Sequence, residues 1–88
     1  MDIDSVHAGI EHEKAELCAR YPGVTDCSTL LVRWDENGAK RYSLRIDIRC
    51  PQHQTLVSGE SRDSAQAAIA AGFRAARQRL QEAAWACR

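Results

Sequence analysis

The chain has 88 residues, of which 44% are hydrophobic, and its twelve basic residues balance its twelve acidic ones. These values are typical of one ordinary globular domain, they exclude a disordered chain, and they leave little room for a deep catalytic cleft. The charge is unevenly spread, because residues 1–26 carry six acids against two basic residues, a net of −4, and residues 61–88 carry five arginines against two acids, a net of +3.

Two explanations account for this asymmetry. The basic region can face a polyanion such as RNA, or an acidic first helix can simply pack beside a basic last helix. The composition alone leaves both explanations open.

The absence of membrane-spanning and secretory segments indicates where in the cell the protein is expected. No apolar run is long enough to span a membrane, and residues 1–5 lack the basic and apolar regions of a secretory signal. We therefore expect a cytoplasmic protein with no membrane partner. In that reducing compartment we expect free, mostly buried thiols at all four cysteines, which are Cys18, Cys27, Cys50 and Cys87.

The first predicted element is a helix over about residues 5–20. Asp4 or Ser5 can cap its start, and Pro22-Gly23 ends it. An apolar stripe at helical spacing gives the helix one buried side, which consists of Ile3, Val6, Ile10, Leu17 and Tyr21.

Strands are predicted over about residues 27–35, 41–50 and 55–60. The middle strand has the clearest pattern in the chain, because apolar residues alternate strictly with polar ones at Tyr42, Leu44, Ile46, Ile48 and Cys50. This alternation predicts a strand with one face in the core and the other in solvent.

The turn between the first two strands sets their register. If Trp34 and Tyr42 share the core face and lie opposite one another, the loop holds an odd number of residues. We therefore predict the three-residue loop Asn37-Gly38-Ala39, with Leu30 and Val32 facing the core beside Trp34. The same register places Asp35 opposite Arg41 on the open face.

A long last helix is predicted over about residues 63–86, with Ser61 or Asp63 as its cap. Gly72 allows this helix to approach the sheet closely, and the turns around Trp85 are expected to overhang the sheet. The predicted buried stripe consists of Ala65, Ile69, Phe73, Ala76, Leu80 and Ala83 or Ala84.

These elements predict a single domain over residues 1–88 with an α+β fold of order α-β-β-β-α. Both helices must bury an apolar stripe, and the strands offer one apolar face. The arrangement that satisfies both is two helices packed on one face of an antiparallel sheet, with the other sheet face open.

Arginines are the candidate functional residues, because their guanidinium groups suit contacts with phosphate. The predicted RNA-binding candidates are Arg74, Arg77 and Arg79 on the last helix and Arg33, Arg45 and Arg49 on the strands. The alternative for each group is an ordinary solvated surface, with Asp35 and Asp47 pairing with the strand arginines.

No catalytic residue, metal site, cofactor or small-molecule substrate is expected. The sequence contains no known nucleophile, phosphate-loop or zinc-protease motif, which argues against an enzyme. Cys50 and His53 have the spacing of half a zinc site, but no second half follows.

From the middle strand onward the chain resembles the family of ribosome hibernation-promoting factors and ribosome-associated inhibitors, also called sigma-54 modulation proteins. The resembling segments are Arg41 to Ile48, Pro51, Thr55 to Val57, Arg62-Asp63, Ala67 to Ile69, Phe73 and Arg77 to Leu80. The resemblance implies a cytoplasmic stress-response protein that binds rRNA and regulates translation. The family fold has a further strand before its first helix, and that helix is usually basic.

Two other functions are compatible with the predicted element order. Double-stranded-RNA-binding domains share it, although they carry a lysine cluster where this chain reads Ser61-Arg62-Asp63-Ser64. The third possibility is an interaction module that binds no nucleic acid and forms a homodimer through an open strand edge or the end of the last helix.

Overall fold

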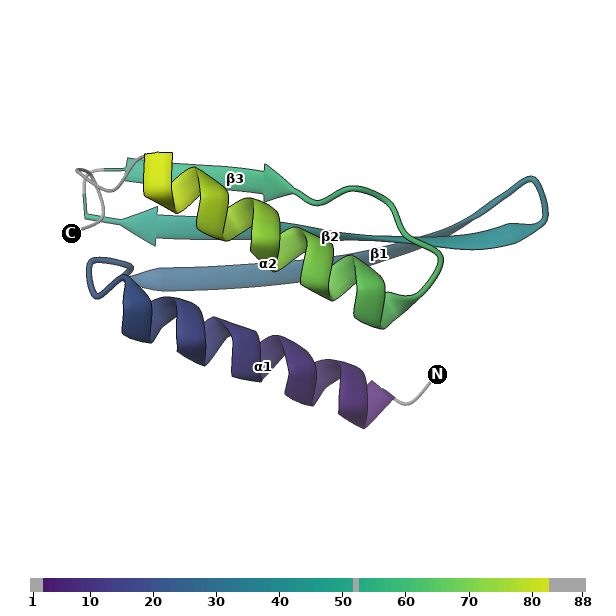
Figure 1. The fold of residues 1–88 in the computed structure, drawn as a ribbon, viewed down its shortest axis with the longest axis horizontal. Coiled ribbons are helices and arrows are strands. Elements are labelled where there is room, and N and C mark those ends of the chain that lie inside the picture. The colour runs from purple at the N-terminus through teal and green to yellow at the C-terminus, as the bar shows by residue number, and fades with distance from the viewer. Residues whose placement is uncertain (1–2, 52, 83–88) are drawn as a thin grey trace.

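The computed structural model describes residues 3–51 and 53–82. They form helix α1 (Ile3–Arg20), strands β1 (Asp26–Glu36), β2 (Ala39–Cys50) and β3 (His53–Ser58), and helix α2 (Ala65–Glu82). The strands pair antiparallel in the order β1-β2-β3, and the helices run side by side over one face of the sheet (Figure 1). The predicted α+β fold with an open sheet face is confirmed. Neither described helix is long and apolar enough to cross a membrane.

The core lies between α2 and the central strand β2. The predicted apolar residues of β2 are all less than a tenth exposed, and Leu44 and Phe73 are fully buried. From the described helical stripes, the buried residues are Val6, Leu17, Ala65, Ile69, Phe73, Ala76 and Leu80. Ile3, in contrast, is 74% exposed, so the predicted stripe of α1 is only partly buried.

Gly72 is the point of closest approach between α2 and the sheet. A Cβ atom at this position would lie 2.8 Å from the Cβ of Leu44, and a Cβ at Gly59 would lie 2.7 Å from the Cα of Gly72. Carbon atoms cannot be this close without displacement, so the absence of two side chains lets α2 rest on the backbone. The close approach predicted for Gly72 is therefore confirmed.

The β1–β2 turn differs from the prediction. Glu36 pairs with Ala39, so the loop contains only Asn37 and Gly38, and both have positive φ angles, of 52° and 80°. This is the backbone of a type I′ hairpin turn, for which Asn-Gly is a preferred sequence. The predicted three-residue loop is wrong, because Asn37 adopts the left-handed conformation as well as Gly38.

The shorter loop shifts the register of β1 by one residue and reverses its faces. Arg33 lies opposite Tyr42, and Trp34 opposite Arg41. Leu30 is 59% exposed and Trp34 37% exposed on the open face, whereas Leu31 packs against the core. The predicted core face of Leu30, Val32 and Trp34 is therefore wrong.

The same shift corrects two predictions for charged residues. Asp35 lies opposite Lys40 rather than Arg41. Arg33 and Asp35 alternate with Leu30 and Trp34, so they belong to the side of the sheet that the helices cover.

Two element boundaries near α2 also differ from the prediction. Strand β3 begins at His53 and ends at Ser58, whereas the sequence predicted a strand over about residues 55–60. The cap of α2 is Ser64, whose Oγ accepts a hydrogen bond from the backbone N–H of Ala67 at 3.2 Å. The predicted caps Ser61 and Asp63 are wrong, and the predicted positions of residues 83–86, including the overhang of Trp85, lie outside the described residues.

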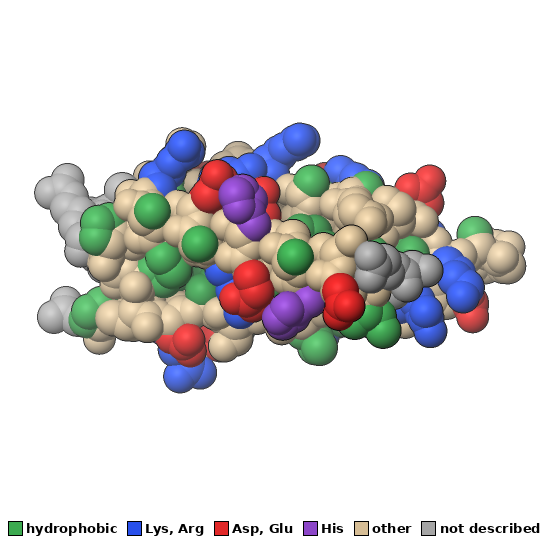
Figure 2. All heavy atoms as spheres, turned by 90° about the horizontal axis from the view of Figure 1, so that it is seen from below, with side chains coloured by type: hydrophobic (Ala, Val, Ile, Leu, Met, Phe, Trp, Pro, Cys, Tyr) green, Lys and Arg blue, Asp and Glu red, His purple; other side chains and the backbone are tan. Residues whose placement is uncertain are grey.

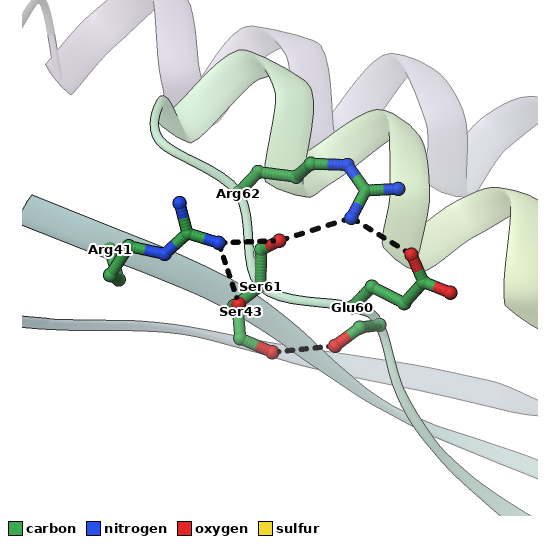
Figure 3. A network of polar contacts seen from close by, with 6 residues as sticks. Arg41, Ser43, Glu60, Ser61 and Arg62 are labelled. Carbon is green, nitrogen blue, oxygen red and sulfur yellow. Dashed lines mark hydrogen bonds and ion pairs between the residues drawn. The ribbon is translucent and has the colours of Figure 1, made fainter.

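The segment between β3 and α2 continues the sheet edge where β3 has ended. Tyr42 and Arg62 exchange two backbone hydrogen bonds of 2.8 Å. The guanidinium of Arg41 donates to the carbonyl and hydroxyl oxygens of Ser61, at 3.2 and 2.9 Å (Figure 3). Ser43 Oγ donates to the carbonyl of Gly59 at 2.8 Å. These contacts engage Arg41 in holding the chain at the start of α2.

The cysteines differ from the predicted set of buried thiols. Cys50 is disulfide-bonded, Cys18 is a free and exposed thiol, and Cys27 is free and half-buried. Burial raises the pKa of Cys27 to about 11. Cys18 and the carboxylates of Asp26 and Asp47 raise it further, and the positive charge of Lys14 opposes them. Because Cys50 is disulfide-bonded, the expectation of four free thiols is wrong.

Candidate nucleic-acid interface

The six candidate arginines do not share one surface. Arg74, Arg77 and Arg79 belong to α2, which covers one side of the sheet. Arg45 and Arg49 alternate with the buried residues of β2 and so lie on the opposite, open face. Arg33 is exposed on the helix side of the β1–β2 hairpin. The structure therefore divides the predicted interface between two faces of a thin molecule.

On α2, the three arginines have different partners. Arg77 donates from its NH1 group to Glu13 Oε2 of α1 at 3.1 Å, with 37% and 29% of the two side chains exposed. Arg74 and Arg79 are exposed and make no side-chain hydrogen bond or ion pair within the described part of the chain. Arg74 and Arg79 are therefore the α2 guanidinium groups available to an external anion.

Neutral hydrogen-bonding side chains accompany Arg74, whereas Arg79, five residues further on, lies about 140° further round the helix. Gln66, Gln78 and Gln81 are exposed, and Gln66, Arg74 and Gln78 follow at multiples of four residues along one helical side. Helix α2, over Ala65–Glu82, contains three arginines and only one acidic residue, Glu82. This outer side of α2 thus presents several N–H donors with a local positive charge, which suits phosphate oxygens.

Helix α1 provides the opposite charge beside α2. Its acids include Glu11, which pairs with Lys14 at 3.6 Å, and Glu16, which lies 3.3 Å from His12 Nε2. The side of the molecule seen in Figure 2 carries acidic and histidine side chains along its middle, with most basic ones nearer its margins. The flank of α2 away from α1 is therefore the part of this helix where these carboxylates would repel an external anion least.

The Arg77–Glu13 contact also bears on the charge asymmetry of the sequence. It shows an acidic first helix packed beside a basic last helix and joined to it by an ion pair. Packing of an acidic helix beside a basic one therefore explains part of the charge asymmetry without any external partner. The remaining positive charge at Arg74 and Arg79 is not balanced in this way.

The open sheet face is less basic than predicted. Arg49 pairs with Asp47 at 3.4 Å, and Asp47 also accepts a hydrogen bond from Gln54 Nε2 at 3.0 Å. Arg45 is exposed and makes no side-chain hydrogen bond or ion pair within the described residues. Leu30 and Leu56, which are 59% and 68% exposed, lie on the same face. Leucines beside charged residues on this face were not predicted from the sequence, because the two faces of β1 had been assigned to the wrong sides of the sheet.

The described residues contain no group of three or more His, Cys, Asp or Glu side chains that could hold a metal ion. Comparison of the chain with protein-family models, with curated proteins and with solved structures finds no match. The functional argument therefore depends on the placement and partners of individual side chains.

Proposed function

We propose that this protein associates with ribosomes and binds rRNA through backbone contacts made by the outer side of α2. The observation that carries the proposal is that Arg74 and Arg79 are both exposed on α2 without a partner in the described structure, Arg74 beside exposed glutamines. The proposal places the protein in the cytoplasm and gives it a role in translation regulation under stress, as the family resemblance implies.

The expected binding is electrostatic and sensitive to salt. A protein that neutralises phosphates with arginine releases counterions, and log K falls with log salt with a slope of about −0.7 to −0.9 per phosphate neutralised. With Arg74 and Arg79 as the main contacts, we expect a slope of about −1.4 to −1.8. Because the whole chain has no net charge, long-range attraction is weak and binding depends on these local contacts.

Ribosome pelleting across a salt series tests the proposal. The double variant Arg74→Glu with Arg79→Glu should lose most of its ribosome-bound fraction at low salt. Arg77 is left intact in this variant, because changing it would also remove its contact with Glu13.

The matched control is Arg33→Glu with Arg45→Glu, which changes the net charge by the same amount on other surfaces. It should retain the bound fraction of the unaltered protein. Equal losses in the two variants would show that overall charge, and not the outer side of α2, determines binding. A protein that stays in the supernatant at low salt, even with ribosomes from stationary-phase cells, would contradict the proposal.

A specific observation favours double-stranded RNA as a second candidate ligand. The described sheet has three strands in the order β1-β2-β3 with both helices on one face, which is the element order of double-stranded-RNA-binding domains. At the start of α2, however, the guanidinium of Arg62 is held by the Ser61 carbonyl and by Glu60, both at 3.0 Å. A gel shift on a duplex of about 16 bp distinguishes this ligand from the ribosome.

A further inference from the structure

The open sheet face carries an apolar groove that the proposed RNA contact does not use. Three of the four strongly exposed large hydrophobic residues in the described chain lie on this face, namely Leu30, Trp34 and Leu56. A groove of about 370 Å³ crosses the sheet between Leu30 and Leu56. Apolar surface of this kind, mixed with charge, marks an interaction site more often than a bare solvated face.

The residues of the groove form two neighbouring rows across the strands. One row is Leu30, Arg45 and Ser58, and the next row is Ser28, Asp47 and Leu56. Each strand contributes one residue to each row, and its two residues differ either in size or in the sign of their charge. On β1 and β3 a leucine in one row stands beside a serine in the other, and on β2 an arginine stands beside an aspartate.

This pattern is self-complementary under a two-fold rotation. Consider an axis that runs across the strands midway between the rows, at the level of Thr29, Ile46 and Val57. Rotation about this axis places the first row of one copy against the second row of the other copy. Each strand then lies over the same strand of the other copy and runs antiparallel to it. Leu30 then faces a serine on β1, Leu56 faces a serine on β3, and Arg45 faces Asp47.

We propose that the open sheet face binds a second copy of this chain, in a face-to-face dimer with this two-fold symmetry. Arg45, which has no partner in the described structure, gains a carboxylate from the other copy. Large side chains meet small ones, as interdigitating sheet faces require. Sheets packed in this aligned manner cross at about −30°, which keeps residues near the axis, Arg45 and Asp47 above all, in contact.

The size of the face suits a weak dimer. Three strands about 4.8 Å apart and up to 12 residues long make an open face of roughly 500 Å² in projection, about half of the 43 × 24 Å outline of the described chain. A standard protein interface buries about 800 Å² on each partner. The dimer would cover the face opposite to α2, so Arg74 and Arg79 of both copies would stay exposed, and the inference does not depend on RNA binding.

Sedimentation velocity from micromolar to millimolar protein measures the dimer directly. Arg45→Asp should weaken dimerisation by about tenfold or more, since the two-fold symmetry places an altered residue against an aspartate at two points in each dimer. Asp47→Arg should weaken it similarly. The double variant Arg45→Asp with Asp47→Arg restores opposite charges across the interface and should recover most of the affinity.

Two further variants separate the interface from general effects. Leu56→Ser removes an exposed leucine, so it should leave folding intact and weaken the dimer. Arg74→Asp changes charge equally on the other side of the molecule and should leave the dimer unchanged.

A chain that is monomeric at every concentration overturns the proposal, as does a double variant with no recovery. A monomer whose ribosome pelleting is weakened by Arg45→Asp would identify RNA as the occupant of this face. Dimerisation that survives in Arg74→Glu with Arg79→Glu, while ribosome pelleting is lost, would separate the two surfaces and support both proposals.

Discussion

The two faces of the same sheet have opposite chemistry. The helix-covered face buries Leu44, Ile46 and Ile48 almost completely, whereas the open face leaves Leu30 and Leu56 more than half exposed beside Arg45. Both faces contain aliphatic residues, so hydrophobicity alone does not distinguish them. The difference is that α2 already covers one face, and the other retains leucines that no described element covers. The first face therefore determines stability, and the second is available for binding.

The largest expected contrast is between two leucine truncations. Leu44→Ala removes a fully buried side chain beneath α2 and should lower the free energy of unfolding by about 2–5 kcal/mol. Leu56→Ala, at a 68% exposed site, should change it by less than about 0.5 kcal/mol. Urea unfolding curves of the two variants measure the difference. Similar losses in both would show that the open face is also covered within the folded chain.

The next effect concerns the contact between α2 and the covered face. In Gly72→Ala the new methyl group would meet the side chain of Leu44 at 2.8 Å, so overpacking should cost about 1–3 kcal/mol. Gly38→Ala is not a suitable control, because its φ of 80° introduces backbone strain. Gly9→Ala is suitable, since a Cβ there meets nothing within 4 Å, and it should be neutral or stabilising in thermal unfolding. A neutral Gly72→Ala would mean that α2 can move away from β2 without loss.

A smaller effect is expected at the ion pair between the helices. Arg77→Ala should destabilise the protein by less than about 1 kcal/mol, because both partners are partly exposed and screened by water. Adding Glu13→Ala should cost little more, since the pair has already been broken. A double-mutant cycle measured at low and high salt gives the interaction energy. A salt-independent value would exclude the electrostatic explanation.

The last effect, which is absent at neutral pH, is a pH dependence of stability at Cys27. Its pKa is raised to about 11 from an ordinary 9.0, so the folded state retains a proton that the unfolded state loses first. Stability should therefore be complete below pH 9 and decline as the pH rises toward 11. Cys27→Ala should reduce this decline relative to the parent. Thiol labelling gives an independent check, because exposed Cys18 should react faster than Cys27.

Much of the fold could be predicted because β2 alternates so strictly. Five apolar residues at every second position leave one choice of face, and the structure buries all of them. In β1 the adjacent Leu30 and Leu31 offer an aliphatic side chain to either face, so its own pattern does not decide the orientation. The turn decides it, and reading Asn37-Gly38 as a two-residue type I′ loop would have given the correct register.

The candidate site could be predicted only in part. The sequence identified the arginines but not their partners, because Arg77 and Glu13 are 64 residues apart and meet only in the folded chain. The distinction between an arginine that is already paired and one that is free determines which guanidinium groups are available to an external anion. The leucine groove was missed for a different reason, since it follows directly from the reversed orientation of β1.

The contact of Gly72 with Leu44 and Gly59 has a consequence for how Arg74 meets a partner. Where helices rest on layers of side chains, those chains can change rotamer and let the helix slide or roll by small amounts. At Gly72, backbone lies directly against backbone and against the stem of a leucine, with no long side chain between them. Arg74 lies only two residues after Gly72 in the same helix. The distance of its Cα atom from the sheet is therefore nearly constant. A ligand that reaches Arg74 therefore has to order the arginine side chain but not the helix that carries it.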